Sequence, residues 1–147
     1  MIYTASEINI PSGSTITGIS FNTALYEGVN SYSHERTIEV YLQEIDYDEF
    51  GSQIMKSLSD NDKVFDGTKT FESEKWIPIN FSKTLTYEGG NILVCVYDKT
   101  GTYVPSSKYY PNFYTISLPE SLPKRKKVLQ KSSTKSYGNP TAENISG

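Results

Sequence analysis

The stretch "YEGGNILVCVYDKTG", residues 87 to 101, joins a double glycine, an apolar segment and an Asp-Lys-Thr-Gly turn. Residues 92 to 97 are apolar at almost every position, which is typical of a strand covered on both faces of a sheet. A phosphate-binding glycine loop follows a strand and opens a helix. Here Gly89 and Gly90 precede the strand and no helical pattern follows, so we predict that they turn the chain into a central strand.

Three other segments alternate apolar and polar residues with the period of two that indicates half-buried strands. In one of them, Pro78 cannot donate to a strand ladder and therefore predicts an edge strand or a bulge. The segments are "TITGISFN" (15–22), with Ile19 and Phe21 on one face, "RTIEVYLQE" (36–44), with Ile38, Val40 and Leu42 opposite Glu39, Tyr41 and Gln43, and "WIPINFS" (76–82), with Ile77, Ile79 and Phe81 on one face.

The spacing of these strands leaves little room for crossover helices. Only residues 47–58 place apolar residues at helical spacing, and glycine and serine interrupt them, so either a short helix or a long loop fits. We predict an all-β protein, an antiparallel β-sandwich of jelly-roll or immunoglobulin-like topology. The 147 residues suffice for one domain, expected at 1–135 with a last strand near 126–132, followed by a linker at 136–147.

Charge and composition restrict the classes of partner. The chain has a formal net charge of −3, whereas nucleic-acid binders usually carry a basic excess. The basic run "KRKK" (124–127) is therefore interpreted as a solvated surface segment. No segment approaches the roughly 20 apolar residues that a membrane helix requires. We expect no nucleic acid, no membrane insertion and a monomer.

The residues available for catalysis are few. The single Cys95 lies in the apolar strand, where burial raises a thiol pKa, and the single His34 lies in a polar segment predicted to be a loop. We therefore expect no enzyme and no cofactor. The carboxylates in "EIDYDEFG" (44–51) and "LSDNDKVFDG" (58–67) do not match a calcium-binding loop; turn-forming residues are favoured, and an irregular structural calcium site stays open.

Aromatic residues supply the candidate binding site. The segment "YVPSSKYYPNFY" (103–114) resembles a recognition surface because tyrosines offer broad contact area and a hydroxyl group. The alternative is that these side chains cap one end of the sandwich. A further aromatic on the strand at 76–82 points opposite to Ile77; it either forms a solvent-side platform or is covered by packing, and packing is favoured. The candidate ligand-binding residues are Trp76, Tyr103, Tyr109, Tyr110 and Tyr114.

Several segments in order, "IYTASEI", "TITGISF", "IEVYLQE", "VFDGT" and "TLTYEGGNILVCVYDKTG", resemble a jelly-roll-like, adhesin-type β-sandwich module of secreted and surface proteins of gut Bacteroidetes. The resemblance covers roughly residues 2 to 103. It implies a non-catalytic bacterial extracellular or cell-surface module that contributes to adhesion or to carbohydrate or glycoprotein binding. The implied partners are a glycan or a host surface protein, together with neighbouring domains of the parent chain. A structural spacer without a ligand is the alternative.

Overall fold

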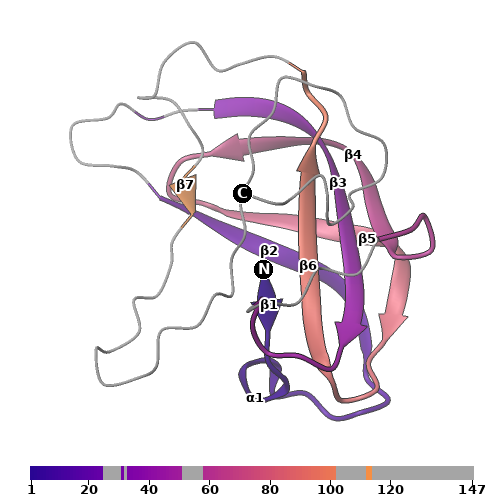
Figure 1. Cartoon of the computed structure of the whole chain (residues 1–147). Helices are drawn as coiled ribbons and strands as arrows, with labels where there is room; N and C mark the ends of the chain where they lie inside the picture. Colours follow the sequence, from indigo (N-terminus) through magenta and orange to yellow (C-terminus); the bar gives the residue numbers. More distant parts are fainter. Residues whose placement is uncertain (25–30, 32, 51–57, 102–111, 114–147) are drawn as a thin grey trace.

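The protein consists of two antiparallel sheets packed face to face (Figure 1). The computed structural model describes residues 1–24, 31, 33–50, 58–101 and 112–113. The elements are β1 (Ile2–Tyr3), α1 (Ala5–Ile8), β2 (Thr15–Ala24), β3 (Ser33–Ile45), β4 (Lys63–Glu72), β5 (Trp76–Thr86), β6 (Asn91–Asp98) and β7 (Asn112–Phe113). One sheet has the order β1-β6-β3-β4 and the other β5-β2-β7, with antiparallel pairing throughout. The predicted all-β sandwich class is confirmed.

The main core fills the space between the two sheets. The predicted inward faces of β2 and β5 meet the inward face of β3 there, and Val40 and Ile79 are fully buried. Burying such aliphatic side chains stabilises a fold by roughly 1.5–3 kcal/mol each. The buried members of this core are Phe21, Ile38, Val40, Leu42, Val64, Phe71, Ile77, Ile79, Tyr87, Ile92 and Val94.

Strand β3 is buried on both faces, so the prediction that it is half-buried is wrong. Its other face carries Tyr41, which is 0% exposed, and Ile45. On this face Phe50 and Leu58, which follow β3 in the chain, pack into a second cluster with Ile2 and Leu93. Residues 51–57 lie outside the described part, so the helix or loop predicted for 47–58 is described only at its ends.

The prediction for the double glycine is confirmed. Gly89, with φ of 109°, and Gly90 form the turn between β5 and β6. The hydroxyl of the buried Tyr87 donates to the carbonyl of Gly90 at 2.9 Å, and the amide of Gly90 donates to the carboxylate of Glu44. Strand β6 then lies between β1 and β3, as expected of a central strand.

Strand β5 forms an edge of the three-stranded sheet, as Pro78 predicted. Its register with β2 shifts between the pairs Ile16↔Leu85 and Gly18↔Asn80, which places extra residues in β5. At this irregularity the hydroxyl of Ser82 donates to the carbonyl of Val64 in β4 at 3.1 Å. The bulged part of β5 therefore ties the two sheets together along one side.

None of the helices within the described ranges is long and apolar enough to cross a membrane. The predicted domain boundary at 135, the last strand near 126–132 and the linker at 136–147 all lie outside the described residues.

Candidate functional site

Trp76 is the first residue of β5, and its side chain points away from the core. It is 66% exposed, whereas its neighbour Ile77 is buried between the sheets. Alternation along a strand explains this contrast, because successive side chains point to opposite faces. Of the two interpretations of Trp76, the structure supports the solvent-side platform, and the packing interpretation is wrong.

On the paired part of β2 and β5, the residues that share the outer face with Trp76 are uncharged. Directly opposed residues in an antiparallel pair share a face, so the register of β2 with β5 identifies the neighbours. Ser20, Pro78 and Asn80 on this face are exposed, and Asn22 is half-buried. The opposed pairs on this outer face are Asn22↔Trp76, Ser20↔Pro78, Gly18↔Asn80 and Thr15↔Thr86.

Gly18 allows β5 to approach β2 closely beside this face. A Cβ atom at position 18 would lie 2.9 Å from the backbone carbonyl oxygen of Ile79 and 3.6 Å from Oδ1 of Asn80. Backbone cannot give way as a flexible side chain can, so a larger residue would displace β5. The glycine therefore leaves the space that the backbone of β5 and the Asn80 side chain occupy beside β2.

Thr23 holds the turn that leads into Trp76. Its side chain is 0% exposed, and its hydroxyl donates to backbone carbonyls of Glu72 and Lys75. The amide of Lys75 in turn donates to the same hydroxyl oxygen at 3.0 Å. These contacts fix the backbone just before Trp76, which makes the platform part of a rigid strand end. Sequence patterns do not reveal this role, because a lone threonine in a strand carries no such signal.

The lysines that flank the outer face along β5 are engaged with other groups. The ammonium of Lys75 lies 2.7 Å from the carboxylate of Glu72. Lys83 donates to the backbone carbonyl of Asn61. The two lysines that flank Trp76 and its outer face, Lys75 and Lys83, therefore each already contact an acceptor oxygen of the protein.

Ligand binding is not tested for any of the predicted residues, and four of them lie in parts of the chain that the structure does not describe. Tyr103, Tyr109, Tyr110 and Tyr114 lie outside the described residues, as does the basic run at 124–127. Trp76 is thus the one predicted binding residue that the described part of the chain places.

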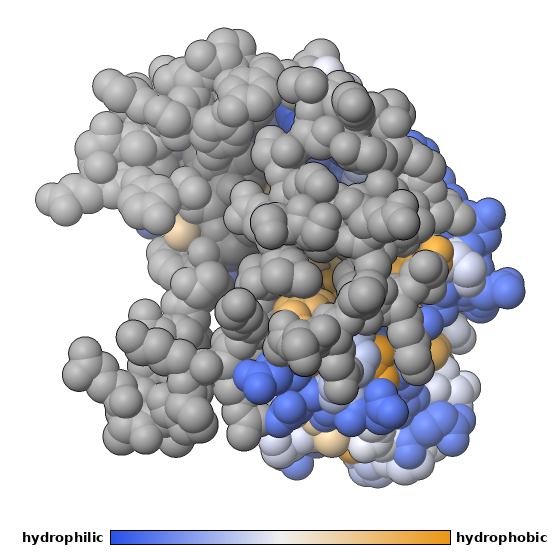
Figure 2. Space-filling model, in the orientation of Figure 1, coloured by the Kyte–Doolittle hydropathy of each residue, from blue (hydrophilic) through white to orange (hydrophobic). Residues whose placement is uncertain are grey.

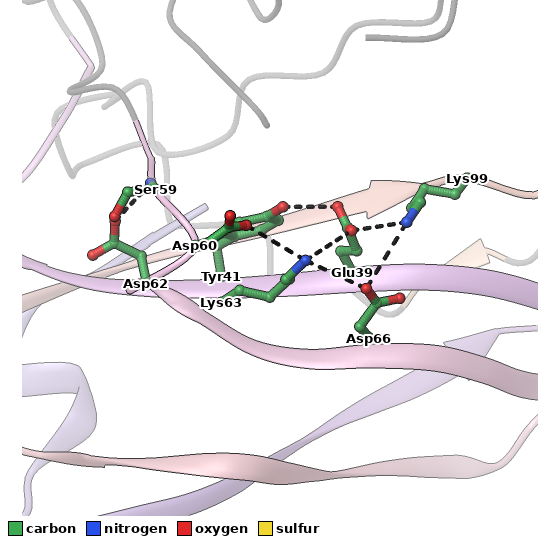
Figure 3. A network of polar contacts seen from close by, with 8 residues as sticks. All are labelled: Glu39, Tyr41, Ser59, Asp60, Asp62, Lys63, Asp66 and Lys99. Atoms are coloured by element: carbon green, nitrogen blue, oxygen red, sulfur yellow. Dashed lines mark hydrogen bonds and ion pairs between the residues drawn. The ribbon is translucent and has the colours of Figure 1, made fainter. Parts of the chain in front are cut away.

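A polar network lies on the outer face of the four-stranded sheet (Figure 3). The carboxylate of Glu39, whose side chain is 7% exposed, accepts hydrogen bonds from Lys99 at 2.9 Å and Lys63 at 3.2 Å. The hydroxyl of Tyr41 donates to its second oxygen at 2.7 Å. Asp66 accepts from Lys63 at 3.3 Å, so the network joins β3, β4 and the residue that follows β6.

The network favours the charged forms of Glu39, Lys63 and Lys99. Burial raises the pKa of the Glu39 carboxyl, but the hydrogen bonds from Lys99, Tyr41 and Lys63 outweigh burial and lower that pKa to about 2. The hydrogen bond to Glu39 raises the pKa of Lys63, and the same contact raises that of Lys99. A protonated ammonium has no free electron pair for attack, so these lysines are structural partners and not nucleophiles.

Cys95 and His34, the two residues considered for catalysis, both lie on described strands. Burial raises the pKa of the Cys95 thiol to about 11, which agrees with the expected unreactive cysteine. His34 does not lie in a loop as predicted; it is part of β3, half-buried and opposite Phe71 in β4. The loop prediction failed because the pairing partner of this polar segment is distant in sequence.

The second carboxylate cluster forms a turn. Asp62 accepts from both the amide and the hydroxyl of Ser59 at 2.8 Å, and its own amide donates to the carbonyl of Ser59. This is the local hydrogen bonding that favours aspartate in turns. Within the described ranges, no cluster of three or more His, Cys, Asp or Glu residues could hold a metal ion.

An open, mostly apolar pocket of about 250 Å³ is formed by residues of both sheets and by Ile8 of α1. Side chains from both sheets line it, and none of the lining residues is charged. On the face of the molecule in Figure 2, the described surface is largely hydrophilic with smaller hydrophobic patches between. The residues that line the pocket include Tyr3, Ile8, Ile19, Phe81, Ile92 and Val94.

These features define the chain as an all-β sandwich with an exposed aromatic platform on one sheet. No known family model matches the chain, and neither a curated protein nor a solved structure matches it.

Proposed function

We propose that the chain is a non-catalytic binding module of a bacterial secreted or surface protein and that it binds glycan chains through the outer face of β2 and β5. The observation that carries the proposal is the 66% exposed indole of Trp76 on a rigid strand end. Large aromatic side chains are usually mostly buried, so a tryptophan this exposed calls for an explanation.

The chemistry of the face suits a sugar. The indole presents a flat apolar surface to the C–H face of a pyranose ring, and its π system attracts the slightly positive C–H hydrogens. The amides of Asn22 and Asn80 and the hydroxyl of Ser20 each donate and accept, as sugar hydroxyls do. A few polar groups around an apolar contact are typical of specific ligand sites.

The two outer faces of the sandwich differ in availability. Phe50 and Leu58 pack with the buried Tyr41 on the outer face of the four-stranded sheet, and Glu39 on the same face is also buried. On the β2–β5 pair, Ser20, Pro78 and Asn80 are exposed. A ligand therefore finds an accessible strand face on the smaller sheet.

A non-catalytic role agrees with the chemistry of the described residues. The thiol of Cys95 has a pKa raised to about 11, and Lys63 and Lys99 are held as ammonium ions by Glu39. Extracellular placement and a contribution to adhesion rest on the resemblance to adhesin-type modules. A module placed outside the cell is exposed to cell-surface glycans, which are therefore its expected partners.

The test uses Trp76 as its own reporter, since it is the only tryptophan in the chain. The purified protein is screened on a glycan array and against host glycoproteins, and hits are titrated by indole fluorescence. Trp76→Ala is expected to abolish binding while leaving the thermal unfolding temperature unchanged. Tyr3→Ala, which removes another exposed aromatic on a different strand, is the matched control and is expected to bind normally.

Binding that survives Trp76→Ala would overturn this site and send the search to other surfaces, including the tyrosines of 103–114. No binding to any immobilised glycan or glycoprotein, by a protein with a cooperative unfolding transition, would favour the structural spacer instead.

A further inference from the structure

The geometry points to an uncharged oligosaccharide, longer than one sugar ring, as the ligand of the β2–β5 face, lying along β5 from Trp76 towards Asn80. This inference rests on the proposed function and names its ligand class. Three observations support it. The outer face carries no charge, the flanking lysines already contact other groups of the protein, and Trp76 and Asn80 lie too far apart for one sugar ring.

The outward residues on the paired part of β2 and β5 carry no charge, in a chain of which 21% of residues are charged. A sulfated or carboxylated glycan needs a cation to replace the water it loses on binding, because an unpaired ion is costly to desolvate. Asparagine amides and serine and threonine hydroxyls instead match the donor and acceptor groups of neutral sugars.

Lys75 and Lys83, which flank the face, do not provide the cation that an anionic glycan would need. Lys75, 59% exposed, is held 2.7 Å from Glu72, and Lys83 donates to the carbonyl of Asn61. An anionic ligand near Lys75 would meet the carboxylate of Glu72 as well as the ammonium, which reduces its net attraction. Electrostatic attraction is further reduced because the chain is negative overall.

The recognition groups are too far apart for one sugar ring. Trp76 and Asn80 are four positions apart on β5, which corresponds to about 13 Å at roughly 3.3 Å per residue. Pro78 lies between them on the same face, opposite Ser20. A glycan chain parallel to β5 can stack one ring on the indole and place a later ring at the Asn80 amide, which lies beside Gly18 of β2.

The experiment compares neutral oligomers of glucose, mannose, galactose and xylose, one to six units long, with oligogalacturonate and sulfated oligosaccharides of the same lengths. Binding to the full chain is measured by Trp76 fluorescence and calorimetry at low and high salt. We expect neutral oligomers to bind about tenfold more tightly once they span both groups, with little dependence on salt.

Asn80→Ala tests the contribution of the Asn80 end of the site separately from that of the Trp76 end. It is expected to remove most of the gain from chain length while leaving the fluorescence change caused by the shortest ligands intact. Thr84→Ala, an exposed substitution within the irregular part of β5 between Asn80 and Leu85, is the control and is expected to keep the gain.

Tighter binding of the anionic series with a steep salt dependence, or affinity independent of length, would overturn the inference and leave glycan binding at Trp76 standing. If no sugar of either series binds and the array is also empty, the proposed function itself fails, and the inference fails with it.

Discussion

The hydroxyl of Tyr41 donates a 2.7 Å hydrogen bond to the carboxylate of Glu39, two residues earlier on β3, and both side chains are buried on the outer face of the four-stranded sheet. This contact involves a carboxylate that is only 6% exposed. The charge is tolerated there because Lys63 and Lys99 reach the same carboxylate from neighbouring segments. The pair therefore links the stability of β3 to the positions of β4 and of the residue that follows β6.

Tyr41→Phe should destabilise the protein because it leaves a buried carboxylate oxygen without its donor. We expect a loss of about 1–2 kcal/mol in the free energy of unfolding. Lys75→Ala, which removes an exposed ion pair with Glu72, should change it by less than about 0.5 kcal/mol. Urea unfolding followed by circular dichroism measures both, and equal effects would contradict the central role of Glu39.

Acid should weaken the fold through Glu39. Its folded-state pKa of about 2 lies below the ordinary glutamate value of 4.5, so its contribution to stability is complete above pH 4.5 and is lost as pH falls towards 2. Glu39→Gln should be less stable than the wild type at pH 7, and the gap should shrink across this window. Urea unfolding at a series of pH values checks the prediction, and a constant gap between pH 7 and 2 would refute it.

Gly18→Ala should destabilise the sandwich, because its Cβ atom would meet the backbone oxygen of Ile79 at 2.9 Å. We expect a loss of about 1–3 kcal/mol, the range for overpacked sites. Gly67→Ala is the control: its Cβ atom would meet only the end of the Phe65 ring at 3.3 Å, and a ring can shift. Thermal unfolding of the two variants should therefore differ, with Gly18→Ala the less stable.

Cys95 should react slowly with thiol reagents in the folded protein. Burial raises its pKa to about 11, so little thiolate exists at pH 8. We expect modification by a disulfide reagent at pH 8 to be at least about tenfold faster in denaturant than in buffer, because an ordinary cysteine has a pKa near 8.5. A native rate equal to the denatured one would show that the strand does not protect the thiol.

Local pattern in the sequence determined the strands and their inward faces. Period-two alternation placed Ile77 and Ile79 inside, continuous apolarity marked β6 as central, and Pro78 marked β5 as an edge. These predictions succeeded because strand geometry alone decides which side chains share a face, and a proline lacks the amide hydrogen that a central strand must donate.

The tertiary structure alone decided which faces are covered. Alternation predicted that Glu39 and Tyr41 share a face, but it did not predict that Phe50 and Leu58, which come later in the chain, pack against Tyr41 there. The same holds for Trp76, whose outward direction was predictable and whose 66% exposure was not. Exposure depends on contacts between segments distant in sequence, and no local periodicity encodes those contacts.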